Sequence, residues 1–170
     1  MALMVVERDA LIQQYADGPA RLRRAVARVP QAGLRWNPAP GEWSVHEIVC
    51  HCADAETNAA ARIRYLVAER DPLVVAFDEA GWATTFEYHE HPLGLALWTV
   101  EAVRANTGAL LRRLPEAAWT RQGRHTASGR YTMEDWLRGY AWHVDEHVRQ
   151  IEQTLAAWSR DERRPAATAG

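Results

Sequence analysis

The sequence predicts an all-α protein with four principal helices. Apolar residues recur at steps of three and four over several long stretches, which is the period of an amphipathic helix, whereas the alternation typical of strands is nearly absent. Two of these stretches also begin with clear capping signals. The chain has 170 residues, of which 48% are hydrophobic and 25% charged. This length and composition predict one globular domain with a sizeable core.

Charge and cysteine content narrow the classes of function. The formal net charge is -2, whereas a protein whose main partner is nucleic acid needs a positive excess. The chain contains no lysine, which excludes a lysine nucleophile or Schiff base. Cys50 and Cys52 are too close together to staple a fold. With no signal peptide and no run of about 18 apolar residues, we expect a cytoplasmic protein that does not enter a membrane.

The first helix is expected over residues 5–29, where aliphatic side chains and one tyrosine mark an apolar face. Gly18–Pro19 interrupts this pattern, because proline lacks a backbone donor and glycine weakens a helix. We therefore expect a kink or a restart at that point. Residues 34–42 then form a proline-rich connector that cannot be a regular helix.

The second helix has the clearest start signal in the chain. Ser44 is placed as the N-cap, and Glu47 three residues later completes a reciprocal capping box. The helix is expected to end near residue 69, before Pro72. Residues 73–88 carry few periodic signals, so they predict a long connection between helices 2 and 3 with at most short helical turns.

The third helix is expected from Pro92 to about residue 114, where Pro115 stops it. One extra turn is expected over residues 116–119, and residues 122–130 are expected to be a polar loop. The last helix, residues 131–158, begins with a second capping signal, Thr132 followed by Asp135. The domain is therefore expected to span residues 1–158, followed by a flexible tail over residues 159–170.

A pair of histidines stands out in the last helix. His143 and His147 are four residues apart, so their side chains lie on one face, one turn above the other. Two such imidazoles can reach one metal ion, and His51 on the second helix is the best candidate for a third ligand. Three histidine ligands suit zinc, nickel, iron or copper and leave a position for water or substrate. The alternative is three unrelated histidines that are packed in the core.

Several nearby residues are candidates for supporting roles. Glu47 and Asp54 lie one turn before and one turn after His51, so either could orient its imidazole, and Glu146 could do the same for His143. Ordinary solvated helix charges are an equal alternative for all three carboxylates. Two aromatic residues of the last helix are expected to line a pocket beside the pair: Tyr140 and Trp142.

The remaining cysteines and histidines have simpler explanations. Cys50 and Cys52 point about 100° to either side of His51 on a helix, which favours small core residues over metal ligands. His89 and His91 precede the third helix, where they could lend a ligand or line the mouth of a site, although a solvated loop is the favoured interpretation. Two further histidines are expected at the surface: His46 and His125.

Two blocks of the sequence resemble the signature of the DinB-like (DinB/YfiT) superfamily. The first is WNPAPGEWSV from Trp36, followed by EIV and then by HCADAE, which ends at Glu56; the second is the closing H-x-x-x-H-x-x-Q-I. The resemblance covers about residues 5–158 and implies a four-helix bundle in up-down-down-up order. It also implies that one divalent metal, with zinc or nickel favoured, is held by the residues that match the motif: His51, His143 and His147.

The resemblance also implies a class of chemistry. The superfamily includes transferases that use bacillithiol or mycothiol and mycothiol-dependent maleylpyruvate isomerases, in which a metal activates a thiol because a bound thiol is deprotonated. We therefore expect a transferase that joins a low-molecular-weight thiol to a small electrophilic substrate, although no thiol-binding motif is recognisable here. The alternatives are a metal-dependent hydrolase and a non-catalytic metal-binding or interaction bundle. Family resemblance also makes a homodimer an expectation.

Overall fold

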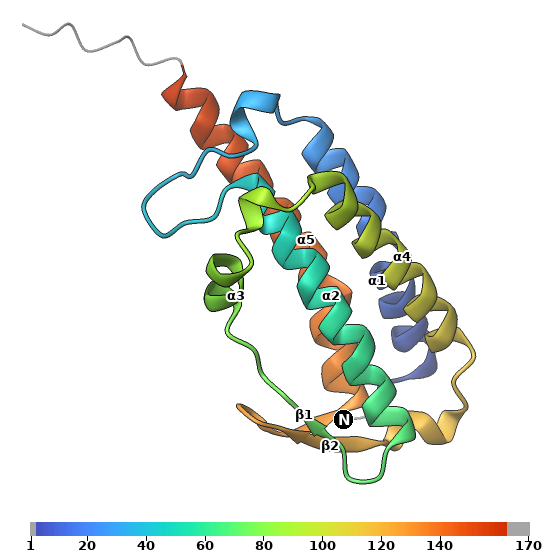
Figure 1. The fold of residues 1–170 in the computed structure, drawn as a ribbon. Coiled ribbons are helices and arrows are strands. Elements are labelled where there is room, and N and C mark those ends of the chain that lie inside the picture. The colour runs from blue at the N-terminus through green and yellow to red at the C-terminus, as the bar shows by residue number, and fades with distance from the viewer. Residues whose placement is uncertain (1–2, 163–170) are drawn as a thin grey trace, which may run out of the picture.

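Four long helices form the body of the protein in a computed structural model, which describes residues 3–162 (Figure 1). They are α1 (Val5–Ala27), α2 (Val45–Ala68), α4 (Leu93–Arg112) and α5 (Met133–Asp161). In Figure 1, α1 and α5 run in one direction, and α2 and α4 run in the other. The prediction of an all-α, up-down-down-up four-helix bundle is therefore confirmed.

The order of the helices requires one long crossing of the bundle. α1 packs against α4 and α5, and α2 packs against the same two helices, so α1 lies diagonally opposite α2, and α4 lies diagonally opposite α5. Because α2 and α4 are parallel, the chain must return along the full bundle between them (Figure 1). This connection, residues 69–92, confirms the predicted long connection between helices 2 and 3. It carries three short elements: β1 (Leu73–Val74), α3 (Glu79–Thr85) and the 3-10 turn η2 (Tyr88–Glu90).

Both predicted capping boxes are present. At the start of α2, Ser44 Oγ accepts a hydrogen bond from the Glu47 backbone N–H, and the Glu47 carboxylate accepts one from the Ser44 N–H. Thr132 and Asp135 make the same reciprocal pair at the start of α5. Each box satisfies backbone donors that a helix end leaves free. The two helices that carry the candidate ligands therefore begin at fixed points.

Of the kink or restart expected at Gly18–Pro19, the restart is wrong, because α1 continues as one helix through Pro19. The reason is a tertiary contact. Pro19 has no N–H to offer the carbonyl four residues earlier, and that carbonyl, of Tyr15, accepts a hydrogen bond of 2.8 Å from Arg104 of α4 instead. The partner that proline removes is thus replaced by a side chain from another helix.

The predicted polar loop at residues 122–130 is wrong, because this segment is a hairpin. β2 (Gln122–His125) pairs antiparallel with β3 (Gly129–Thr132), and β1 adds parallel to β2, giving the order β1-β2-β3. These strands are at most four residues long and mostly polar, so they carry no alternating apolar signal. The sheet lies at the end of the bundle where α2 ends and α5 begins (Figure 1).

The ends of the elements also refine the expectations. The extra turn expected after the third helix is present as the 3-10 turn η3 (Glu116–Thr120), and another, η1 (Gln31–Gly33), precedes the proline-rich connector. α5 runs to Asp161, so the first residues of the expected tail are helical. The expectation for residues 163–170 lies outside the described residues. Within residues 3–162, no helix is both long and apolar enough to span a membrane.

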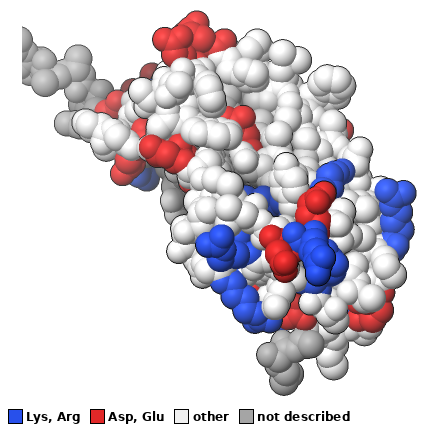
Figure 2. Space-filling view, turned by 60° about the horizontal axis from the view of Figure 1, so that its bottom comes forward, with Lys and Arg blue, Asp and Glu red and all other residues white. Residues whose placement is uncertain are grey.

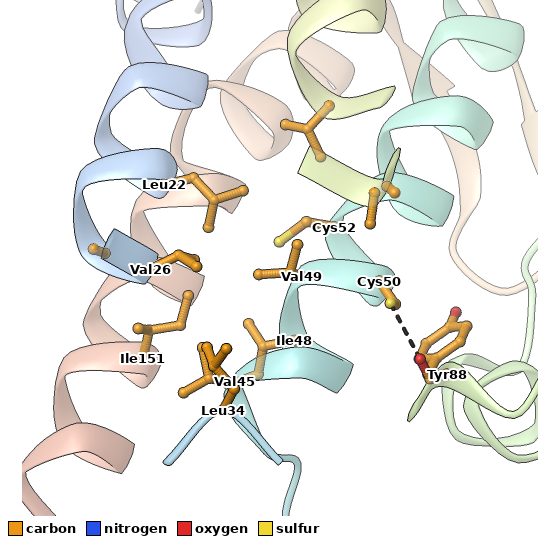
Figure 3. Close-up of a cluster of buried hydrophobic side chains, with 14 of the residues drawn as sticks. Leu22, Val26, Leu34, Val45, Ile48, Val49, Cys50, Cys52, Tyr88 and Ile151 are labelled. Carbon is orange, nitrogen blue, oxygen red and sulfur yellow. Dashed lines mark hydrogen bonds between the residues drawn. The ribbon is translucent and has the colours of Figure 1, made fainter. Parts of the chain in front are cut away.

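Two clusters of buried apolar side chains fill the bundle, and each draws on several helices. The first cluster, shown in Figure 3, includes Leu22, Val49 and Ile151; the second lies toward the sheet and includes Tyr15, Ile63 and Trp136. Cys50 and Cys52 are free and buried in the first cluster, where Cys50 Sγ donates to the Tyr88 carbonyl at 3.5 Å (Figure 3). The interpretation of both cysteines as core residues is confirmed.

A polar layer separates the two apolar clusters. On each long helix, several positions separate the residues of one cluster from those of the other. Four residues in these gaps lie close to one another, one each from α1, α2, α4 and α5: Gly18, Glu56, Arg104 and His143. We refer to these four residues as the polar layer.

Candidate metal centre

The structure brings together all three histidines that the sequence proposes as ligands. His51 of α2 faces His143 and His147 of α5, and each offers a ligand atom within 4.8 Å of the other two. The Nε2 atoms of His143 and His147 are 3.2 Å apart. His51 is buried, and the other two are partly buried. The three imidazoles therefore converge on one point from two rigid helices.

Burial keeps two of these imidazoles neutral. It lowers the pKa of His51 to about 3, with further lowering by His147 and His143. Burial also lowers the pKa of His147 to about 4, with help from His143. Neutral imidazole has a free lone pair and is the form that binds a metal. The donor set therefore fits a divalent transition metal, with zinc and nickel among the ions that imidazole suits.

In His143 and His147 the ring nitrogen that faces away from this point lies near an acceptor, whereas Nδ1 of His51 is buried with no hydrogen-bond partner among the described residues. Nδ1 of His147 lies 2.9 Å from Gln150 Oε1, and Nδ1 of His143 lies 3.6 Å from Glu56 Oε1. An acceptor at Nδ1 favours a proton on that nitrogen and leaves the Nε2 lone pair free for a ligand bond. The observed geometry is therefore that of histidines presented to a metal through Nε2.

Glu56 is the carboxylate that lies beside a candidate ligand, and helix spacing from His51 and His143 did not predict it. It is completely buried, and although burial alone would raise its pKa, the Arg104 guanidinium with its hydrogen bond and the nearby His143 outweigh this, so its pKa is lowered. It is therefore a charged acceptor. The available signal was its place in the apolar stripe of α2, where Cys52 and Ala59 occupy neighbouring core positions, because a carboxylate at such a position needs a partner.

The carboxylates proposed as supports for the ligands make other contacts. Glu47 completes the capping box and also accepts a hydrogen bond of 2.8 Å from the side-chain amide of Asn37. Asp54 accepts a hydrogen bond of 2.6 Å from the Tyr88 hydroxyl. Glu146 is exposed. Helix spacing placed these groups one turn from His51 or His143, but their side chains point to other faces of the helices.

The two aromatic residues expected to line the pocket behave differently. The Tyr140 ring is buried, 5.9 Å from the His143 ring, and its hydroxyl accepts a hydrogen bond of 2.7 Å from Arg62. Trp142 is 49% exposed, so about half of its surface lies in solvent. A residue beside His143 in sequence is rotated by about 100° around the helix, which explains why only Tyr140 faces the site.

The other histidines fix the long connection to the start of α2. His46 was expected at the surface, but it is buried, and its Nε2 donates to the His91 carbonyl at 2.8 Å. His89 Nε2 lies 2.8 Å from Ser44 Oγ, while His91 is exposed and His125 is half-buried in the hairpin. The three-histidine group does not include any of these four residues.

The long connection also supplies one wall of the site. The Phe77 ring stacks 6.5 Å from the His51 ring, and Trp82 packs 4.6 Å from Phe77. Trp43, in the segment before α2, lies 4.7 Å from His51 on another side. Glu79, in the first turn of α3, brings its Oε2 within 3.9 Å of His51 Nε2 and keeps half of its side chain exposed. An apolar wall and one solvent-facing carboxylate therefore border the three histidines.

A groove of about 670 Å³ begins beside this group. It runs from Trp43, Ala80 and Gln150 along the last turns of α5 to Arg160. Trp43 contacts His51 and Gln150 contacts His147, so two residues of the groove wall touch two of the candidate ligands. A small molecule bound in the groove would lie next to the imidazoles.

Comparisons with known proteins agree with this architecture. The family model of the DinB superfamily matches residues 14–151. A protein of Oceanobacillus iheyensis is 29% identical, with 82% of this chain and 81% of that protein covered; one of Geobacillus kaustophilus is 33% identical, with 78% and 75% covered. Both carry the provisional name of metal-dependent hydrolase.

A solved structure has the same fold. It is YfiT from Bacillus subtilis, which is provisionally described as a metal-dependent hydrolase with an unusual four-helix bundle topology. The TM-score is 0.86 at 24% sequence identity, and the alignment covers 93% of this chain and 91% of that one. The match of the family model over most of the chain, together with this fold, shows that the chain belongs to the DinB superfamily.

Proposed function

We propose that this protein is a metal-dependent hydrolase of a small molecule, in which His51, His143 and His147 hold one divalent cation. The observation that carries the proposal is the convergence of three imidazoles within 4.8 Å of one another, with a single solvent-facing carboxylate, Glu79, beside them. Three protein ligands are the pattern of a catalytic site, because a closed structural site uses four. The provisional names of the relatives support the same class.

Each bordering residue has a role in this proposal. A divalent cation held by the three histidines would supply Lewis-acid chemistry and lower the pKa of a nearby nucleophile. Glu79 accepts the proton of the attacking water and passes it to solvent, which its half-exposed side chain reaches. Phe77 and Trp82 keep bulk water from the face of His51 that they cover. The groove beside Gln150 holds the rest of the substrate.

The test is hydrolysis of activated esters and anilides by protein loaded with increasing amounts of zinc. The rate is expected to follow zinc occupancy. Glu79→Gln should lower kcat by about 100-fold, the lower end for loss of a general base, while zinc affinity is retained. Asp78→Asn is the matched control, because Asp78 caps the same short helix through Gly81 N–H and asparagine caps equally well. A rate that ignores zinc, or a fully active Glu79→Gln variant, contradicts the proposal.

Transfer of a low-molecular-weight thiol to a small electrophile is the second candidate. The groove of about 670 Å³ favours it, because this space can hold a second reactant beside the imidazoles. In cobalt-loaded protein, a small thiol such as cysteine should then produce a sulfur-to-cobalt charge-transfer band that is absent from His147→Ala. A hydrolase should show little thiol response, and a non-catalytic bundle should show neither the band nor ester turnover.

A further inference from the structure

A completely buried ion pair lies directly beside the candidate metal centre. Arg104 Nη2 of α4 is 2.6 Å from Glu56 Oε1 of α2, and neither side chain has any exposed surface. The second carboxylate oxygen accepts a hydrogen bond of 3.0 Å from the Tyr15 hydroxyl of α1. Both oxygens of the carboxylate are therefore held by groups from other helices.

The Arg104 guanidinium joins the remaining helices of the bundle. Nη1 donates to the Tyr15 carbonyl of α1 and Nη2 donates to the Tyr140 carbonyl of α5, each at 2.8 Å. Replacing a buried ion pair by apolar residues is often neutral or stabilising. Stability of the fold therefore does not explain why two charges occupy the centre of the core, and their position beside His143 requires its own explanation.

α1 is built to receive this guanidinium. Pro19 frees the Tyr15 carbonyl, because proline has no N–H to donate to the residue four positions earlier. Gly18 provides the space: a Cβ at this position would overlap Arg104 Nη1 and lie 3.2 Å from its Cζ. Pro19 therefore leaves a free carbonyl acceptor for Arg104, and Gly18 leaves space for its guanidinium. These are the two residues that disturb the helical pattern in the sequence.

The ion pair ends at a metal-ligand candidate. Glu56 Oε1, the oxygen that Arg104 holds, is 3.6 Å from Nδ1 of His143. That nitrogen is buried and has no hydrogen-bond partner within 3.5 Å among the described residues. The other ring nitrogen of His143, Nε2, faces His147. Glu56 is therefore the nearest carboxylate for a proton on Nδ1, and a proton there leaves Nε2 free for the ion.

We propose that Gly18, Pro19, Arg104 and Glu56 form a positioning relay that fixes the tautomer and the ring orientation of His143 for metal binding. This proposal rests on the proposed metal centre. None of the four residues touches the ion in it: Gly18 and Pro19 seat Arg104, Arg104 fixes the Glu56 carboxylate, and Glu56 accepts the Nδ1 proton of His143. Loss of a carboxylate that orients a histidine ligand typically weakens metal binding by 10–100-fold.

Gly18→Ala is the sharpest test, because it adds only one methyl group, in a helix that contains no candidate metal ligand. In an ordinary helix position this substitution is stabilising. Here it should displace Arg104 and weaken zinc binding by about 10-fold, measured by competition with a chromophoric chelator. Gly108→Ala is the matched control, since Gly108 is also buried in a helix but an added Cβ would have only ordinary contacts, 3.5 Å to Arg112 and 3.9 Å to Ala16.

A second variant keeps the test decisive if Gly18→Ala does not fold. Glu56→Gln combined with Arg104→Met removes both charges at nearly constant volume, so the core holds no unpaired charge. It should fold and yet bind zinc about 10-fold or more weakly. Zinc affinity equal to that of the wild type in either folded variant overturns the relay.

Nuclear magnetic resonance of the zinc-loaded wild type gives an independent readout. His143 should coordinate through Nε2 and carry a slowly exchanging proton on Nδ1, and in Glu56→Gln with Arg104→Met that proton should exchange faster. Coordination of His143 through Nδ1 would overturn the relay. Failure of the relay is distinct from failure of the metal centre, because a wild type that binds no zinc at all refutes the centre itself.

Discussion

Two arginine–carboxylate pairs link helices in this protein, and they share most of their local chemistry. Arg104 pairs with Glu56 at 2.6 Å and lies 4.2 Å over an aromatic ring, while Arg8 pairs with Glu116 at 2.7 Å and lies 4.6 Å over another. The first pair has no exposed surface, whereas in the second only Arg8 is buried and the Glu116 side chain is 74% exposed, so we refer to the second as the exposed pair. The end of the bundle turned forward in Figure 2 carries acidic and basic side chains side by side.

The difference shows that the location of an ion pair decides what it contributes. An exposed pair is screened by water and contributes about 0–1 kcal/mol. A buried pair cannot be screened, so each charge depends on the other, and breaking it costs about 3–5 kcal/mol. The buried pair lies in the polar layer beside His143, and the exposed pair contacts no candidate ligand. The two pairs should therefore respond differently to the same kind of substitution.

The largest expected effect is that of Arg104→Met alone. It leaves the Glu56 carboxylate uncompensated in the core and should lower the free energy of unfolding by about 3–5 kcal/mol, measured by urea denaturation. Adding Glu56→Gln should recover most of this loss, because the unpaired charge is then absent. A single variant that loses less than about 1 kcal/mol would place the buried pair in the same energetic class as the exposed one.

A smaller effect is expected at the start of α2. Ser44→Ala should lower stability by about 1 kcal/mol by removing a helix cap, and zinc affinity should fall with it because this cap fixes the turn that leads to His51. Thr132→Ala is the matched change at the start of α5, three turns before His143. It should lower stability with a smaller effect on affinity. An affinity that is unchanged in Ser44→Ala would make that cap purely structural.

The capping carboxylate gives a pH-dependent prediction. Burial alone would raise the pKa of Glu47, but hydrogen bonds from Ser44 and Asn37 and the nearby His89 outweigh it, so its pKa in the folded state is below 4.5. Its contribution is therefore present above pH 4.5 and lost as the pH falls through the lowered value. Glu47→Gln should be less stable than the wild type at pH 7, and urea denaturation in acid should show the difference disappearing. A difference that grows in acid would contradict this assignment.

The smallest effect is expected for the exposed pair. Glu116→Gln should leave the free energy of unfolding close to that of the wild type, and any difference should shrink further in high salt. Zinc affinity should stay at the wild-type value, because neither member of this pair approaches the histidines. A clear loss of affinity would show that ion pairs at the end of the bundle also control the site.

Local rules were sufficient to predict the features that depend on neighbours in the sequence. The capping boxes at Ser44 and Thr132 need residues only three positions apart, and the facing of His143 and His147 follows from one helical turn. His51 was the best candidate for the third ligand from its place on the second helix, and the superfamily resemblance strengthened that assignment, because its partners lie on another helix and local rules do not reach them. The structure brings the three together, and metal binding by them stays a prediction.

Features that depend on contacts between residues far apart in the sequence could not be predicted from these local rules. Gly18–Pro19 predicted a kink or a restart because nothing nearby in the sequence offers a donor for the Tyr15 carbonyl, and that donor is Arg104, 89 residues away. Glu56 and Arg104 are charged residues whose burial depends on the packing of all four helices. The hairpin was missed because its short polar strands acquire their pairing from each other and from β1, and not from an apolar face.

The central claim is that the three histidines form one metal site, and metal content tests it most directly. Protein purified without a histidine tag or chelators should contain about one divalent ion per chain. His51→Ala and His143→Ala should each lose it while circular dichroism remains helical, because the core is large enough to fold without the ion. Metal content that is unchanged in both helical variants would contradict the account.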